Sequence, residues 1–174
     1  TALPGGDFAN PAEIGLYMLS NVAAFEMGKT WSPSQTEVET EVNAVLTQLR
    51  AWQDGSQPPH APGDANAYNN SVFFRGYWIN HTPPRVGGVL GDANHEVPSI
   101  DNAILAASLL TIREWAENKG LNTLAGKADA ILNDMDFMLW YDTGINQFLH
   151  GGINEPQPLP PNNYAWDYYS NEGR

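Results

Sequence analysis

The residues of this sequence best suited to chemistry are carboxylic acids placed at predicted helix starts. Asp101 lies within 97–117, "VPSIDNAILAASLLTIREWAE", where polar residues at the start of a predicted helix precede its apolar face. Glu172 lies in "NYAWDYYSNEGR", directly after a run of tyrosine and tryptophan. An aromatic, partly desolvated setting raises the pKa of a carboxyl group, as a general acid near neutral pH requires. Glu172 is therefore a candidate acid; the alternative is that its charge only favours a helix N-terminus.

Asp101 has the same alternative reading, since a carboxylate in the first turn of a helix interacts favourably with the helix dipole. The chain contains two similar rounds, however, and we align Asp101 with Ile14 or Gly15 of the first round, neither of which is charged. A helix at this place therefore does not need a carboxylate. We expect Ser99 to be the N-cap of the helix, while Asn102 is open to either a structural or a binding role.

Aromatic and acidic residues gather in the predicted loops. Flat rings cover the apolar faces of sugars while carboxylates and amides bind the hydroxyl groups, although such rings can also simply pack the core. Besides Asn102, the candidates for substrate contact are Trp78, Tyr141, Asp142, Tyr164, Trp166, Asp167 and Tyr168. Asp142 is expected to end a helix, where its charge would oppose the dipole and call for a cationic partner. The possible partners are Arg75, Arg85 and Lys127.

The composition argues against several classes of function. The chain has 174 residues and a net charge of -12 at pH 7, which repels phosphate backbones and acidic lipids and so argues against nucleic-acid and membrane partners. There is no cysteine for disulfides or thiolate chemistry. The 4 histidines form no HxxxH pair, and we expect neither a metal nor a cofactor. A calcium site built from Asp64, Asp92 and Asn94 is the alternative.

The predicted elements form two rounds of the same order. Apolar residues recur at helical spacing in 11–28 and 33–52 and again in 97–117 and 121–141, so each round begins with a helical hairpin. Ser32 is expected to cap the second helix. A long polar loop follows each hairpin and contains a short extended piece, "FFRGYWIN" in the first round and "QFLHGGIN" in the second.

Helical hairpins that cannot bury their apolar faces alone stack side by side. We therefore expect an all-α fold, an α/α toroid in which such hairpins close a ring and the long loops cover one end. A closed (α/α)6 barrel needs about twice this length or more. Residues 1–174 are accordingly expected to be the N-terminal part of a larger catalytic domain, with the remainder of the toroid on the same or another chain. The alternative is a small, complete four-helix domain.

Several segments resemble one known family, the glucoamylase-like α/α-toroid domain of cyclic β-1,2-glucan synthases and bacterial endo-β-1,2-glucanases. "NPAEIGLYMLSNVAAFEMG" resembles its opening helix, with Ala12-Glu13 where a threonine or serine is usual. "VPSIDNAILAASLLTIREW" and "ILNDMDFMLWYD" resemble two later segments, and "LHGGIN" and "NYAWDYYSNEGR" a Gly-Gly stretch and a further helix start. Gly173 replaces the commoner alanine. The matching segments cover nearly the whole chain but only part of the family's domain.

The resemblance implies a glycan-active enzyme with its substrate in a cleft at the loop end. We expect a secreted or periplasmic glycoside hydrolase that cleaves a β-glucan, with a β-1,2 linkage as the first expectation. Glu172 would protonate the leaving oxygen, and Asp101 would bind a sugar hydroxyl or be the second catalytic carboxylate that such hydrolysis needs. The alternatives are a glucan transglycosylase and a non-catalytic glycan-binding or assembly domain.

Overall fold

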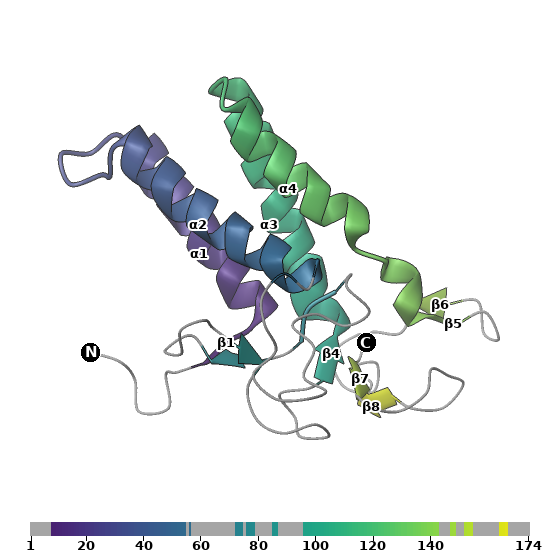
Figure 1. Cartoon of the computed structure of the whole chain (residues 1–174). Coiled ribbons are helices and arrows are strands. Elements are labelled where there is room, and N and C mark those ends of the chain that lie inside the picture. Colours follow the sequence, from purple (N-terminus) through teal and green to yellow (C-terminus); the bar gives the residue numbers. More distant parts are fainter. Residues whose placement is uncertain are drawn as a thin grey trace.

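Two helical hairpins dominate the structure (Figure 1). It is a computed structural model that describes residues 8–54, 56, 72–74, 76–78, 85–86, 96–142, 147–148, 152–154 and 164–166. The first hairpin joins α1 (Pro11–Glu26) to α2 (Gln35–Gln53), and the second joins α3 (Ser99–Asn118) to α4 (Asn122–Asp134). The described structure is predominantly helical, which confirms the predicted all-α class. None of its described helices combines the length and apolarity needed to cross a membrane.

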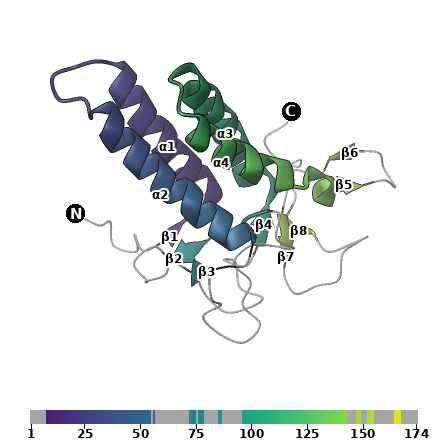
Figure 2. The same cartoon turned by 45° about the horizontal axis from the view of Figure 1, so that its top comes forward.

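Short antiparallel strands form three small sheets at one end of the hairpins (Figures 1 and 2). The first sheet has the order β1 (Phe8–Ala9), β2 (Tyr77–Trp78) and β3 (Arg85–Val86). The second has the order β4 (Glu96–Pro98), β7 (Gly152–Asn154) and β8 (Tyr164–Trp166), and the third pairs β5 (Tyr141–Asp142) with β6 (Gln147–Phe148). Because α1 follows β1 and α3 follows β4, both helices begin at this strand end and run in the same direction.

Complete capping boxes fix the starts of α1 and α2. Asn10 Oδ1 accepts a hydrogen bond from Glu13 N at 2.8 Å, and Glu13 Oε2 accepts one from Asn10 N at 3.0 Å. Ser34 and Glu37 repeat this arrangement at α2. The cap is therefore Ser34 and not the predicted Ser32: Ser34 Oγ accepts from Glu37 N at 3.3 Å, whereas Ser32 Oγ accepts from Lys29 N at 2.9 Å, in the turn before the helix.

The start of α3 has no side-chain cap. Its N-cap is Pro98, and Ser99 is the first helical residue, so the prediction of Ser99 as the N-cap is wrong. Pro98 has an extended backbone and pairs with Gly152 across β4 and β7. The sheet therefore delivers the chain directly into the helix.

The predicted helix 121–141 is interrupted. α4 ends at Asp134, and the carboxylate of Asp136 accepts a hydrogen bond at 2.9 Å from the backbone two residues on, which starts the 3₁₀ helix η2 (Phe137–Trp140). An aspartate that binds the nearby backbone in this way competes with a continuous helix. Asp142 consequently lies in β5, not at the helix C-terminus where the sequence placed it.

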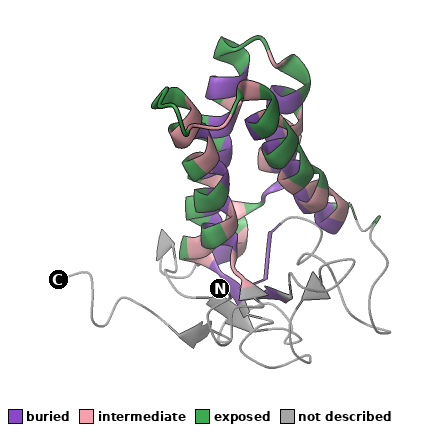
Figure 3. Ribbon diagram, turned by 90° about the vertical axis from the view of Figure 1, so that its left-hand side faces the viewer, coloured by how far each residue is buried: buried purple, intermediate pink, exposed green. Residues whose placement is uncertain are grey.

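The two hairpins pack side by side, with α1 against α3 and α2 against α4, and their buried faces turn toward each other (Figure 3). The helices approach closely at Gly15, where an added Cβ would lie 2.6 Å from Ser108 Oγ and 3.2 Å from Leu105 Cα. Only glycine leaves room for this contact. The predicted inward stripe of α3 is buried and consists of Leu105, Leu109, Ile112 and Trp115.

Polar contacts join α2 to α4 at the edge of the core. Lys127 Nζ donates to Asn43 Oδ1 at 2.7 Å and to Thr47 Oγ1 at 3.0 Å. Arg50 forms an ion pair with Asp134. The amine of Lys127 is thus held by α2, and the prediction that it could neutralise Asp142 is wrong.

Candidate functional site

The described candidate residues lie at the strand end of the hairpins, where Asn102 organises the start of α3. The Asn102 side chain is fully buried. Its Oδ1 accepts from Phe73 N at 2.8 Å, and its Nδ2 donates to Phe73 O at 2.9 Å and to Pro98 O at 2.7 Å. A side-chain amide that accepts from the N–H and donates to the carbonyl of one residue satisfies the same two backbone groups as a neighbouring strand would. Asn102 thereby fastens the loop at Phe73 to the first turn of α3.

This geometry corrects the prediction that Asn102 contacts substrate. Both N–H groups and the carbonyl oxygen of its side chain are engaged by backbone, and no part of the side chain reaches the surface. Removing the amide would leave buried backbone groups without partners. Asn102 is therefore a structural residue that positions its neighbours.

Stacked rings hold the same loop against the end of α2. The rings of Trp52 and Tyr77 stack with centroids 3.9 Å apart and an interplanar angle of 13°, and Phe73 meets Trp52 edge-on at 6.3 Å. The Tyr77 hydroxyl oxygen accepts from Phe74 N at 3.0 Å, and burial raises the pKa of the Tyr77 phenol. The buried Nε1 of Trp52 has no hydrogen-bond partner in the described structure. This cluster fixes β2, which carries Trp78, at the strand end.

Trp140 attaches η2 to β4. Its indole is 1% exposed, and Nε1 donates to Val97 O at 3.2 Å. Tyr141 follows directly and is partly buried. The predicted substrate residue Tyr141 therefore lies at the same end of the molecule as Asp101, and Asp142 follows it in β5.

The second sheet brings a distant part of the chain to the start of α3. Pro98 pairs with Gly152, and Gly152 pairs in turn with Trp166. Tyr164 pairs with Ile153 of the same strand β7. Tyr164 and Trp166, which the sequence predicts as substrate contacts, therefore lie in β8, which pairs with β7, which in turn pairs with β4. They belong to the sheet that precedes α3, although they lie far from Asp101 in the sequence.

Asp101 is the third residue of α3 and is partly buried. Its counterpart is Glu13, the third residue of α1, so the alignment with Ile14 or Gly15 is wrong. Glu13 accepts from the backbone N–H of its N-cap, whereas the N-cap of α3 is a proline, which has no N–H. A capping box cannot close at Asp101, and this common structural use of an acid at the third position is not available to it.

The remaining candidates are placed only in part. Trp78, Asp142, Tyr164 and Trp166 lie in described strands, which fixes their backbone at the strand end. Glu172, Asp167 and Tyr168 lie outside the described residues, as do the calcium candidates Asp64, Asp92 and Asn94. The role of Glu172 as an acid therefore stays a prediction.

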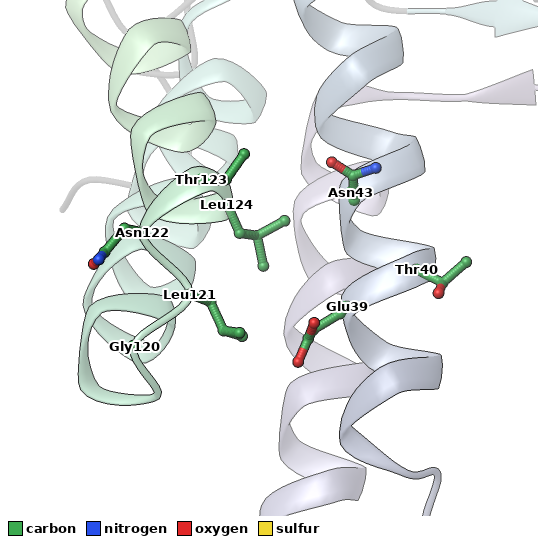
Figure 4. A pocket seen from close by; sticks show the side chains of 8 residues that line it. All are labelled: Glu39, Thr40, Asn43, Gly120, Leu121, Asn122, Thr123 and Leu124. Carbon is green, nitrogen blue, oxygen red and sulfur yellow. The ribbon is translucent and has the colours of Figure 1, made fainter.

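A separate pocket of about 610 Å³ lies between α2 and the turn that joins α3 to α4 (Figure 4). Its lining consists of Glu39, Thr40, Asn43, Gly120, Leu121, Asn122, Thr123 and Leu124. Glu39 is the only acid in this lining, and its Oε1 accepts from Gln35 Nε2 at 2.7 Å. This pocket contains none of the predicted site residues, and its lining lacks the second carboxyl group that glycoside hydrolysis needs.

The sequence left Asn102 open between a structural and a binding role, and it did not identify Trp52 and Trp140 as residues that hold the site together. The recurrence of tryptophan at the end of each predicted hairpin was the available signal for that pair. Within the described ranges, no group of three histidine, aspartate or glutamate side chains is arranged to hold a metal ion. No family model, curated protein or solved structure matches the chain.

Proposed function

We propose that this protein is a glycoside hydrolase domain that cleaves a β-glucan, with β-1,2-linked glucan as the first candidate substrate. The observation that carries the proposal is convergence at the strand end. Asp101 in the first turn of α3, Tyr141 in β5 directly after the Trp140 that binds β4, and Trp166 in β8 reach this end from three distant parts of the sequence. Acids beside aromatic rings provide the hydrogen-bond acceptors and the flat apolar surfaces that a sugar requires.

The resemblance of the sequence to glucan-active toroid domains supplies the reaction class. The parallel packing of α1 on α3, with α2 and α4 behind them, also fits an α/α toroid, because repeated hairpins stack in chain order. In such a ring every inner helix would begin at the same end. That end would carry the substrate cleft.

In the proposed reaction, Glu172 protonates the leaving glycosidic oxygen. Asp101 either binds a sugar hydroxyl or acts as the second carboxylate. A separation of about 5–5.5 Å between the two catalytic carboxyl groups leads to retention of the anomeric configuration, and about 6.5–9.5 Å leads to inversion. Substrate rings would lie against Trp78, Tyr141, Tyr164 and Trp166, with Asp142, Asp167 and Tyr168 as further contacts.

The test is the release of reducing ends from linear β-1,2-glucan, with β-1,3- and β-1,4-glucans as linkage controls. Glu172→Gln is expected to lower kcat by about 10²–10⁴, the usual contribution of a general acid. Asp101→Asn is expected to lower kcat/KM strongly. Glu39→Gln, in the separate pocket of Figure 4, serves as a matched control and should leave activity unchanged.

The outcomes separate the alternatives. Longer glucans formed without net release of reducing ends would identify a transglycosylase. Saturable glucan binding with no turnover would identify a binding or assembly domain. Full activity of Glu172→Gln would overturn the assignment of the acid.

A further inference from the structure

The outer face of α3 is an apolar stripe that nothing covers in the described structure. Ile100 is 38% exposed, Ile104 36% and Leu110 45%. Ala103 and Ala107 lie between them and are exposed as well. Residues spaced by three and four positions share one face of a helix, so these five side chains form a continuous surface, the α3 stripe.

The corresponding face of α1 is already used for docking. Counted from the first residue of each helix, Gly15 in α1 corresponds to Ala103 in α3, and Val22 corresponds to Leu110. Gly15 and Val22 are buried, and Gly15 touches α3 at Ser108. Ala12, the counterpart of Ile100, is buried too, whereas Leu16, the counterpart of Ile104, is 54% exposed. The first hairpin therefore buries against the second the positions that correspond to Ile100, Ala103 and Leu110 of the stripe.

We infer that the α3 stripe is the docking face for the first helix of a third hairpin on the same polypeptide, packed parallel to α3 as α3 packs on α1. The inference deepens the toroid arrangement of the proposed function and rests on it. Continuity with the α1–α3 interface carries it, because stacked repeats use one interface repeatedly and in chain order. A convex stripe of side chains offers no cavity for a small ligand.

A second copy of the chain is the less suitable occupant. Each copy carries a net charge of -12, so two copies repel one another. The outer face of α1, which a head-to-tail copy would present, is partly polar: Tyr17 donates its hydroxyl to Glu41 at 3.0 Å, and Ser20 and Asn21 turn back to bind the Tyr17 carbonyl.

The sequence of the docking helix should complement the α3 stripe. Apolar residues should recur on it at three- and four-residue spacing, with a small residue opposite Ala103 in the place that Ser108 takes opposite Gly15. The sequence predicts a helix to begin near Glu172. If that helix docks parallel to α3, its start lies at the strand end, where α3 begins with Asp101 in its first turn.

The test measures thiol accessibility and needs no substrate, so its failure is distinct from failure of the proposed activity. Residues 1–174 contain no cysteine, and Ala107 in the stripe and Ala44 on α2 are both exposed helical alanines. Single Ala107→Cys and Ala44→Cys variants of the complete natural protein are alkylated with iodoacetamide, and labelling of each peptide is followed by mass spectrometry. Leu110→Cys provides a second stripe position should Ala107→Cys fold poorly.

We expect the thiols in the stripe to react slower than the Ala44→Cys thiol by at least an order of magnitude, equally at low and high protein concentration, because a docked helix must open to admit the reagent. Equal labelling rates at the stripe and at α2 would overturn the inference. Protection that appears only at high protein concentration would assign the stripe to a second copy instead and would overturn it as well.

Discussion

The starts of α1 and α3 occupy equivalent places in the two hairpins but are held in different ways. At α1, Asn10 and Glu13 satisfy each other's backbone N–H groups. At α3, Pro98 and Asp101 stand in the same two places and form no such box. The α3 start is held by Asn102 from within the helix and by the sheet that precedes it.

A helix start can therefore be held by its own sequence, as at α1, or by tertiary contacts, as at α3. Glu13 is occupied as a cap and contributes to helix stability. Asp101 forms no capping box, so this structural role does not explain its place in the first turn of α3. This contrast makes the α3 start the better candidate for function, and the following changes test it in order of expected effect.

Asn102→Ala should be the most damaging of these substitutions. It removes the partners of Phe73 N, Phe73 O and Pro98 O in a fully buried place, and each unsatisfied buried group costs about 1–3 kcal/mol. We expect a loss of about 3 kcal/mol or more in the free energy of unfolding, measured by urea denaturation. Asn43→Ala, at an exposed amide that binds Lys127, is the control and should cost about 1 kcal/mol or less. Equal losses would mean that Asn102 does not hold the α3 start.

Gly15→Ala tests the contact through which α1 docks on α3. The added Cβ would lie 2.9 Å from Ser108 Cβ and 3.2 Å from Leu105 Cα, so the helices must separate, at a cost of about 1–3 kcal/mol. Gly126→Ala in α4 is the matched control, because an added Cβ there meets nothing within 4 Å. The control should stabilise the protein by up to about 1 kcal/mol through helix propensity. The Tm should therefore fall in Gly15→Ala and rise in Gly126→Ala. A Tm change of the same sign in both variants would contradict the close approach at Gly15.

Asn10→Ala tests the locally held start. Loss of the N-cap side chain should destabilise the protein by about 1 kcal/mol, with Ser34→Ala at α2 giving a similar loss because its box is built alike. Chemical denaturation monitored by circular dichroism measures both. The loss should be clearly smaller than that for Asn102→Ala; the reverse order would show that the caps, and not the tertiary contacts, dominate at the helix starts.

Glu26→Gln should have the smallest effect and one that depends on pH. Hydrogen bonds from Lys119 and from the Trp115 indole, which tie the end of α1 to α3, lower the pKa of Glu26 in the folded state. A lowered folded pKa adds stability above the unfolded pKa and loses it as the pH falls through the folded value. The variant should therefore be less stable than the parent at about pH 7 and nearly equal to it at about pH 3.

The measurement for Glu26 is the difference in urea midpoint at the two pH values. Glu117→Gln makes the same chemical change on an exposed part of α3 and serves as the control. If the urea midpoints of Glu26→Gln and the parent differed as much at about pH 3 as at about pH 7, these contacts would not depend on the carboxylate charge.

The spacing of apolar residues along the sequence predicts the two hairpins and the buried faces of their helices. Apolar spacing indicated both hairpins, and the buried stripe of α3 has the predicted residues, because side chains three and four positions apart share a face whatever they pack against. The boxes at Asn10 and Ser34 are also local, although Ser32 was predicted as the cap of α2 and no cap was predicted at Asn10. Such features depend on residues within one helical turn.

The α3 start and the meeting of distant strands depend on tertiary contacts. The break after Asp134 is local, since Asp136 caps the next turn, but the apolar periodicity did not predict it. Pro98 replaces Ser99 as the N-cap because β4 pairs with β7, a partner far along the chain. Asn102 proved structural because Phe73 comes within hydrogen-bond distance of it, which no local pattern reveals. Strand pairing and burial between distant segments depend on how the hairpins stack. The periodicity of apolar residues within one segment does not specify which distant segment it will contact.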